Sequence, residues 1–212
     1  MIKVEYIQHV GDSLAVVNAA RYSFGDESQV LEERDKKLIK YLADHQHMSP
    51  FEHLSLTVKI EVPLYIRSQI MRHRTGAYNE LSRRYTDKDM EFFVPDSYRT
   101  QHKSNRQASA EDLEASKQIY WLIKVDQHNK RALELYKEML ADGICKEQSR
   151  GVLPQDLMTQ FIATFNLRNW AHFVKLREHE GAQVEVQLVA QKVKAILIDK
   201  FGYAAEALLE EE

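Results

Sequence analysis

One run of nine residues, LSLTVKIEV over Leu54–Val62, alternates apolar and polar side chains without interruption. Because neighbouring side chains of a strand point to opposite faces, this run predicts a β-strand with one face turned toward a core. Pro63 follows at once and suits the first turn of a helix, where its missing N–H needs no acceptor. The chain is therefore expected to pass from a half-buried strand into a helix over about residues 64–73.

Patterns elsewhere in the chain predict more helices than strands. A short strand is expected over residues 3–9, and Ser13 is expected to cap a helix that runs toward Tyr22. The other expected elements are helices over 32–43, 109–141, 167–176 and 184–201, a strand over 157–165 and a polar surface loop over 100–108. The order is not a repeating βαβ series, so the prediction is an α+β fold.

Composition limits the class of protein. A chain of 212 residues with 44% hydrophobic side chains can bury one core, so a single domain over residues 1–212 is expected. No apolar run approaches the roughly 20 residues of a membrane span, and no signal peptide is recognisable, so a soluble cytosolic protein is expected. The single cysteine, Cys145, excludes an intrachain disulfide. A net charge of -3 argues against a nucleic-acid partner.

Arginine dominates the basic side chains between residues 59 and 88, apart from histidine: Arg67, Arg72, Arg74, Arg83 and Arg84. A planar guanidinium grips phosphate or carboxylate at two points, which lysine cannot do. On the expected helix, Gln69, Arg72 and His73 share a face that could read a pyrimidine edge or a sugar hydroxyl, clamp a phosphate and donate to an oxygen. Gly76 breaks the helix and is free to take a positive φ and bring backbone donors near an anion. Spacing alone leaves a solvated basic face as the alternative.

The extended motif RHRTGAYNELSRRY, with seven residues between Arg72-His73-Arg74 and Ser82, resembles the signature of flavin-dependent thymidylate synthases. Three more segments resemble that family in the same order along the chain. They are HMSPFEH (47–53), RGVLP (150–154) and NLRNWAHFVKLR (166–177). The resemblance runs from about residue 19 to residue 187.

This resemblance implies helices packed around a small, mainly antiparallel sheet. It also implies reductive methylation of dUMP to dTMP with FAD, NADPH and 5,10-methylenetetrahydrofolate, by a homotetramer whose active sites are shared between subunits. Neither a nucleic acid, a membrane nor a metal is implied. The apolar stripe Ile119, Leu122, Ile123 and Val125, at helical spacing, is expected to be a core or subunit-contact face.

The resemblance also implies roles for individual residues. Those for FAD are Ser23, Ser49, Arg72, His73, Arg74, Glu80, Asn166, Arg168 and His172. Those for dUMP are Gln69, Arg72, Glu80, Ser82, Arg83, Arg84, Arg150 and Arg177. Arg177 is expected to be catalytic, because a fixed guanidinium facing the uracil can favour loss of the N3 proton or stabilise charge on the ring. The hydride and the carbon come from the cofactors, so no protein nucleophile is required.

Two positions differ from the pattern in part of the family. His172 stands where some members have asparagine, and either side chain can donate a hydrogen bond. Gly181 stands where many members have a histidine near the flavin ring, and His179 is the candidate to replace it.

Three other chemistries remain as alternatives. Cys145, with Arg150 five residues on, could be a nucleophile and its activating cation. In a metal-dependent hydrolase, His45 and His47 could share one face of a strand and bind a metal with Glu52-His53. In a nucleic-acid-binding module, the arginines could act with three tyrosines, Tyr78, Tyr85 and Tyr98.

Overall fold

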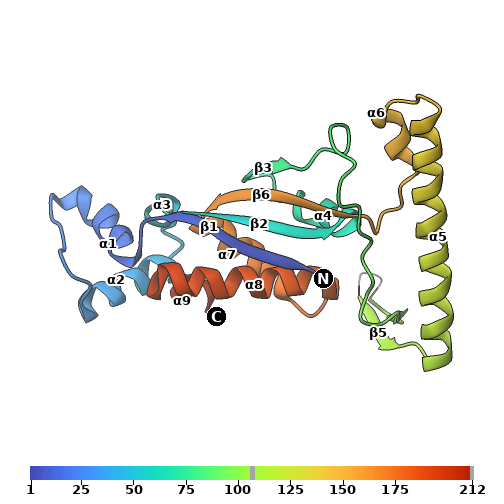
Figure 1. Ribbon diagram of the computed structural model, residues 1–212. Helices are drawn as coiled ribbons and strands as arrows, with labels where there is room; N and C mark the ends of the chain where they lie inside the picture. The colour runs from blue at the N-terminus through green and yellow to red at the C-terminus, as the bar shows by residue number, and fades with distance from the viewer. Residues whose placement is uncertain (106–107, 211–212) are drawn as a thin grey trace.

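The computed structural model describes residues 1–105 and 108–210, and a four-stranded sheet lies at its centre (Figure 1). The strand order is β1 (Lys3–Val10), β2 (Ser55–Pro63), β6 (Met158–Asn166) and β3 (Ala77–Glu80). Every neighbouring pair is antiparallel. A second sheet pairs β4 (Arg99–Gln101) with β5 (Ser109–Asp112), also antiparallel. The predicted α+β fold with a mainly antiparallel sheet is confirmed.

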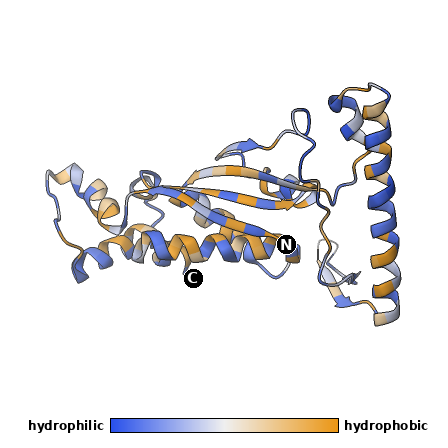
Figure 2. Cartoon of the chain, in the orientation of Figure 1, coloured by the Kyte–Doolittle hydropathy of each residue, from blue (hydrophilic) through white to orange (hydrophobic). Residues whose placement is uncertain are grey.

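The alternating run forms β2, as predicted, and lies between β1 and β6. Figure 2 shows the resulting bands of apolar and polar residues along the strands. The side chains of Leu56, Val58 and Ile60 are fully buried. The polar face is more covered than alternation alone suggests, because Thr57 is buried too and its hydroxyl pairs with that of Thr164 on β6 at 2.9 Å. Both faces of β2 are therefore covered, one by the apolar core and the other around the Thr57–Thr164 hydroxyl pair.

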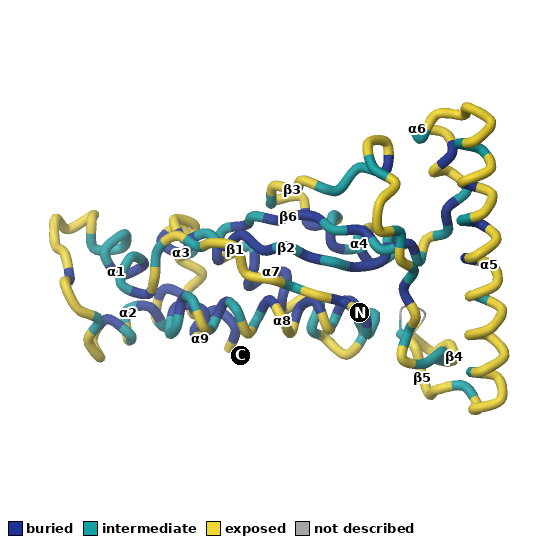
Figure 3. The backbone as a smooth tube through the Cα atoms, viewed as in Figure 1, coloured by how far each residue is buried: buried dark blue, intermediate teal, exposed yellow. Residues whose placement is uncertain are grey.

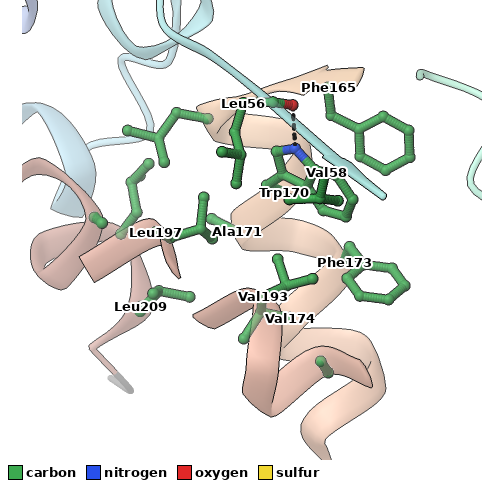
Figure 4. Packing of buried hydrophobic residues seen from close by; sticks show 14 of the residues in the cluster. Leu56, Val58, Phe165, Trp170, Ala171, Phe173, Val174, Val193, Leu197 and Leu209 are labelled. Atoms are coloured by element: carbon green, nitrogen blue, oxygen red, sulfur yellow. Dashed lines mark hydrogen bonds between the residues drawn. The ribbon is translucent and has the colours of Figure 1, made fainter. Parts of the chain in front are cut away.

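Helices from the C-terminal part of the chain pack against the sheet (Figures 1 and 4). They are α7 (Leu167–Glu178), α8 (Val184–Phe201) and α9 (Tyr203–Leu209), so the helices predicted over 167–176 and 184–201 are confirmed. Trp170 is fully buried among Phe165 and Phe173, and its indole N–H donates to the carbonyl of Leu56 at 2.9 Å. Burying a side chain such as Phe173 contributes about 1.5–3 kcal/mol. This cluster fixes α7, which carries several candidate site residues.

Four helical segments lie between β1 and β2: α1 (Ser13–Arg21), η1 (Tyr22–Phe24), α2 (Glu33–Asp44) and α3 (Ser49–Glu52). The prediction that Ser13 caps α1 is wrong, because the cap is Asp12, whose carboxylate accepts from the amide of Ala15. The Ser13 hydroxyl instead donates to the Phe201 carbonyl at 2.6 Å and accepts from the amide of Ala204. It thereby ties α1 to the junction of α8 and α9.

The longest helix, α5 (Ala115–Ala141), stands at one end of the sheet and is largely exposed (Figures 1 and 3). The helix predicted over 109–141 is wrong for residues 109–112, which form β5, because pairing with β4 outweighs their helical pattern. The loop predicted over Thr100–Ala108 is wrong at its start, which belongs to β4. Its residues 106 and 107 lie outside the described part.

Two short helices follow α5 and lead back toward the sheet. These are α6 (Lys146–Ser149) and η2 (Arg150–Val152). A small apolar cluster of Tyr136, Leu153 and Leu157 joins α5 to this segment and to the start of β6. Across residues 1–105 and 108–210, each helix is too short or too polar to cross a membrane.

Candidate active site

The Arg-His-Arg motif lies in a turn, because helix α4 (Leu64–Ile70) ends earlier than the predicted residue 73. Pro63 is the residue before this helix rather than part of its first turn. The Tyr78 hydroxyl lies 2.9 Å from the carbonyl oxygens of both Ile70 and His73, and it holds the turn. Burial raises the pKa of Tyr78 to about 12, so this hydroxyl keeps its proton. The prediction of one helical face shared by Gln69, Arg72 and His73 is therefore wrong.

Gly76 is required for space and does not use the positive φ that the sequence left open to it. Its φ is not positive. A Cβ atom at this position would lie 1.3 Å from Cε1 of Phe165, inside the buried aromatic ring. The chain between the motif and β3 thus passes directly over the core, and glycine alone fits there.

His73, Gln69 and Arg177 meet through hydrogen bonds, although Arg177 comes from α7. The Arg177 Nε donates to His73 Nε2 at 3.0 Å, and its Nη2 donates to the Gln69 carbonyl at 3.2 Å. His73 is buried, and its ring packs edge-on against Phe173 at 4.9 Å between centroids. Arginine has no acceptor, so His73 Nε2 must be unprotonated and the ring proton sits on Nδ1. The arrangement holds Arg177 in one place.

Titration of His73 is displaced toward acid. Burial, followed by the charges of Arg177 and His172, lowers the pKa of His73 to about 4. In the unfolded chain a histidine takes up its proton near pH 6.5. The folded protein therefore resists protonation between about pH 6.5 and pH 4, and stability falls as the pH falls through that window.

We expect the free energy of unfolding of the cofactor-free protein to drop by up to about 3 kcal/mol between pH 6.5 and pH 4 on account of His73. Urea unfolding at closely spaced pH values would measure the drop. The control is His73→Gln, whose side-chain oxygen can still accept from Arg177 but does not titrate. Equal pH dependence in the two proteins would contradict the assignment.

A cavity of about 580 Å³ collects four of the residues expected at dUMP. These are Glu80, Ser82, Arg83 and Arg150. Glu80 accepts a hydrogen bond from Thr159 at 2.8 Å. Its carboxylate also lies 3.5 Å from the Nε of Arg67, which the motif did not include and which lines the same cavity. The only sequence signal for Arg67 was its place among the clustered arginines.

Arg83 and Arg84 occupy different surroundings. Arg83 is buried, and its two terminal nitrogens donate to the carbonyls of Lys88 at 2.5 Å and Asp89 at 3.2 Å, so it closes the loop that follows Ser82. Arg84 is exposed, and its guanidinium stacks over the ring of Tyr85 at 5.2 Å and donates to the Tyr85 hydroxyl. Arg83 therefore holds backbone, while Arg84 lies outside the cavity lining.

The residues expected at FAD are spread along the molecule. Arg72 and Arg74 are exposed on either side of buried His73, and within the described residues neither guanidinium makes a hydrogen bond or ion pair. Arg168 pairs with Glu52 and, with His172, lines a cavity of about 420 Å³ between α7 and the ends of α2 and α9. Arg72, Arg74, Arg168 and His172 offer positive or donor groups.

Three other expected FAD residues have structural surroundings of their own. Asn166 caps α7 through the amide of Asn169 at 2.9 Å. Ser49 begins α3 and Ser23 lies in η1, and both are exposed. Figure 1 places α1, next to η1, and α6, next to Arg150, at opposite ends of the sheet, so one chain does not bring Ser23 and Arg150 together.

The metal-binding alternative predicted His45 and His47 in a strand, and this is wrong. Both follow the end of α2, where their rings stack beside Tyr41 at 4.1 Å and 6.1 Å between centroids. In the part of the chain that the structure describes, no three His, Cys, Asp or Glu side chains are grouped to hold a metal ion. Cys145, the alternative nucleophile, is exposed at the start of α6.

Comparison with known proteins decides the family. The family model described as thymidylate synthase complementing protein matches residues 5–201. A flavin-dependent thymidylate synthase of Thermosipho africanus is 36% identical over 205 residues, covering 96% of this chain and 89% of that protein. One of Pseudothermotoga lettingae is 39% identical over 197 residues, covering 91% and 85%. The chain belongs to the flavin-dependent thymidylate synthase family.

Solved structures agree with that assignment. A UMP/dUMP methylase, PolB from Streptomyces cacaoi, bound with 5-Br dUMP, superposes with a TM-score of 0.89 at 30% identity, covering 98% of this chain and 94% of that one. The same methylase bound with 5-Br UMP gives a TM-score of 0.87 at 31% identity, covering 98% and 93%. The resemblance read from the arginine motif is thus confirmed at the level of the family.

His179, the predicted replacement for a flavin-side histidine at position 181, contacts Gly181. His179 Nδ1 accepts a hydrogen bond from the Gly181 amide at 3.0 Å. A Cβ at position 181 would lie 3.2 Å from that same nitrogen. The exposed His179 ring therefore lies beside Gly181, and its role toward the flavin stays a prediction.

Proposed function

We propose that this protein converts dUMP to dTMP, with 5,10-methylenetetrahydrofolate as the carbon donor and NADPH-reduced FAD as the hydride donor. The observation that carries the proposal is the cavity in which Glu80, Ser82, Arg67 and Arg150 converge, in a chain that belongs to the flavin-dependent thymidylate synthase family. A guanidinium, a hydroxyl and a carboxylate are the groups that bind a phosphorylated sugar.

The donor set fits FAD. Arg72 and Arg74 present two unpaired guanidinium groups on either side of buried His73, and such groups suit the pyrophosphate of a dinucleotide. Arg168 and His172 line a separate cavity that would take a further part of the cofactor. Reduced FAD supplies a hydride and the folate supplies a carbon unit, while the protein binds and orients.

On this proposal, Arg150, Arg67 and Ser82 bind the nucleotide phosphate, and Arg83 acts indirectly by keeping the Ser82 loop closed. Arg84 would have to leave Tyr85 to reach a ligand. Arg177 stabilises negative charge that collects on the uracil. Its guanidinium is already held by His73 and Gln69, so little reorganisation is needed when that charge appears.

Purified protein supplied with FAD tests the proposal. It should bind FAD and show flavin absorption in the visible range, and it should form dTMP under anaerobic conditions when dUMP, NADPH and methylenetetrahydrofolate are added. A colourless protein that takes up no FAD would sink the proposal. Stoichiometric bound metal would favour the hydrolase alternative instead.

Cys145→Ala is expected to keep its turnover within about twofold of the wild-type value, as exposed substitutions do. The thiol is exposed, lies 3.7 Å from Gln148 Oε1 and does not line the cavity of Glu80 and Arg150. Steady-state dTMP formation measures the effect. If the variant were folded by circular dichroism yet inactive, the absence of a thiol nucleophile would be disproved.

The proposal includes an assembly in which several chains share each active site, and we infer a cytosolic homotetramer of single-domain subunits. Exposed apolar side chains on α5 support an association through that helix: Ile119 at 60% exposed, Trp121 at 48% and Ile123 at 52%. The separation of Ser23 from Arg150 within one chain also supports it. A monomeric mass by light scattering would overturn the assembly.

A further inference from the structure

A line of hydrogen bonds runs from the second sheet to helix α4. Arg99 on β4 donates from Nη2 to Glu185 Oε1 at 2.5 Å. The other carboxylate oxygen of Glu185 accepts from Gln183 Nε2 at 2.8 Å. The Gln183 carbonyl oxygen, Oε1, in turn accepts from Gln69 Nε2 at 2.5 Å. Four side chains from three parts of the sequence are thus joined end to end.

The direction of every bond in this line is fixed by Glu185. Its side chain is 6% exposed. Burial alone would raise the pKa of Glu185, but hydrogen bonds from Arg99, from its own backbone and from Gln183 lower it overall, so the carboxylate is charged. A carboxylate can only accept. Gln183 must therefore turn its NH2 group toward Glu185 and its oxygen toward Gln69, and a flip of either amide would oppose two oxygens.

Gln69 ends the line beside Arg177. Its backbone carbonyl accepts from Arg177 Nη2 at 3.2 Å. Its side-chain NH2 group is directed at Gln183, so its side-chain oxygen is the group that remains. That oxygen has no hydrogen-bond partner within residues 1–105 and 108–210, and the residue is partly exposed. The free end of Gln69 is thus an acceptor.

We propose that Gln183 and Glu185 are positioning residues that hold the Gln69 amide with its oxygen toward the nucleotide, so that Gln69 selects a ligand that donates a hydrogen bond. This inference rests on the proposed function, because it takes the nucleotide to lie beside Gln69 and Arg177. The uracil of dUMP offers N3–H as this donor. Cytosine has an acceptor at N3 and is disfavoured.

Glu185→Gln tests the proposal in the FAD-loaded enzyme. The new amide can donate to Gln183 as well as accept, so both downstream amides can flip. We expect KM for dUMP to rise about tenfold with kcat little changed, the effect of one hydrogen bond to the ligand. The inhibition constant of dCMP should stay the same or fall, so that the preference for dUMP over dCMP drops about tenfold or more. Gln183→Met should also lower the preference for dUMP over dCMP, because it removes the group that accepts a hydrogen bond from the Gln69 amide.

The matched control is Gln187→Met. Gln187 donates to the carbonyls of Glu180 and Ala182 in the same loop but does not join the line to Gln69. Loosening the loop in this way should leave the preference for dUMP over dCMP, the ratio of the dCMP inhibition constant to the KM for dUMP, unchanged. If Glu185→Gln weakened all nucleotides equally, or left the ratio at the wild-type value, the proposal would be overturned.

Two analogues separate the sources of the donor. N3-methyl-dUMP lacks the ring donor, and 2′,3′-dideoxyuridine monophosphate lacks the sugar hydroxyl. In Glu185→Gln the discrimination between dUMP and N3-methyl-dUMP should be lost, while that between dUMP and the dideoxy analogue should be kept. The opposite result would overturn the proposal. A wild-type protein that binds no dUMP would overturn the proposed function and this inference together, whereas an active wild type with unaltered variants would overturn this inference alone.

Discussion

Arg177→Ala is expected to lower kcat by about 10²–10³-fold while FAD binding stays close to the wild-type level, the size of effect seen when one fixed donor to developing charge is removed. The structure supplies the reason. Arg177 is held by His73 Nε2 at 3.0 Å and by the Gln69 carbonyl at 3.2 Å, on a helix whose other face is packed into the core. Anaerobic dTMP formation gives kcat, and flavin absorbance on titration gives the affinity for FAD.

Two further variants serve as a conservative substitution and as a surface control. Arg177→Lys keeps the charge but replaces the two separate donor atoms, Nε and Nη2, with one compact ammonium on a flexible stem, so most of the loss should persist. Lys192→Ala removes a cation from the exposed surface of α8 and should be silent. If Arg177→Ala turned over at the wild-type rate, Arg177 would not belong to the site.

Gly76→Ala is expected to destabilise the protein by about 3 kcal/mol or more, at or above the top of the usual range for overpacking. The added methyl would lie 1.3 Å from one carbon of the Phe165 ring and 1.5 Å from the next. A shift of a few tenths of an ångström cannot relieve that overlap. Either the ring leaves the core, or the turn that carries the Arg-His-Arg motif moves. The midpoint of urea unfolding of the cofactor-free protein measures the loss.

Gly151→Ala is the matched control, because a Cβ there would meet no atom within 4 Å. Its midpoint should stay within the error of the wild type. The double variant Gly76→Ala, Phe165→Leu removes part of the ring and should recover part of the lost stability. A Gly76→Ala protein as stable as the wild type would show that the turn can shift without cost.

The sequence predicted elements whose signals are local. Alternation over residues 54–62 located β2, because a strand with one face in a core repeats every two residues. The pattern misplaced the end of helix α4, because the turn that follows the helix is held by the hydroxyl of Tyr78, which belongs to strand β3. It also gave no sign of the packing constraint on Gly76, which comes from Phe165, distant in sequence.

In the candidate site, too, the sequence showed the local motif and not the contacts between distant segments. The arginine motif was visible as a string of letters, and the family to which it pointed is confirmed. Arg67 was not predicted as a site residue, because its role depends on Glu80 and Thr159, which β3 and β6 bring to the same cavity. The line from Arg99 to Gln69 joins three distant segments, and its polarity depends on one buried carboxylate.

Arg83 has a consequence for variation in the loop after Ser82. Its guanidinium grips carbonyl oxygens of Lys88 and Asp89 and not their side chains. Any residue supplies a carbonyl, so position 88 is open to replacement in a mutational library. Position 89 is narrower, because its φ of 50° favours Asp, Asn or Gly. Selection on this loop should therefore retain Arg83 and the backbone conformation at position 89, whereas the side chain at position 88 is free to vary.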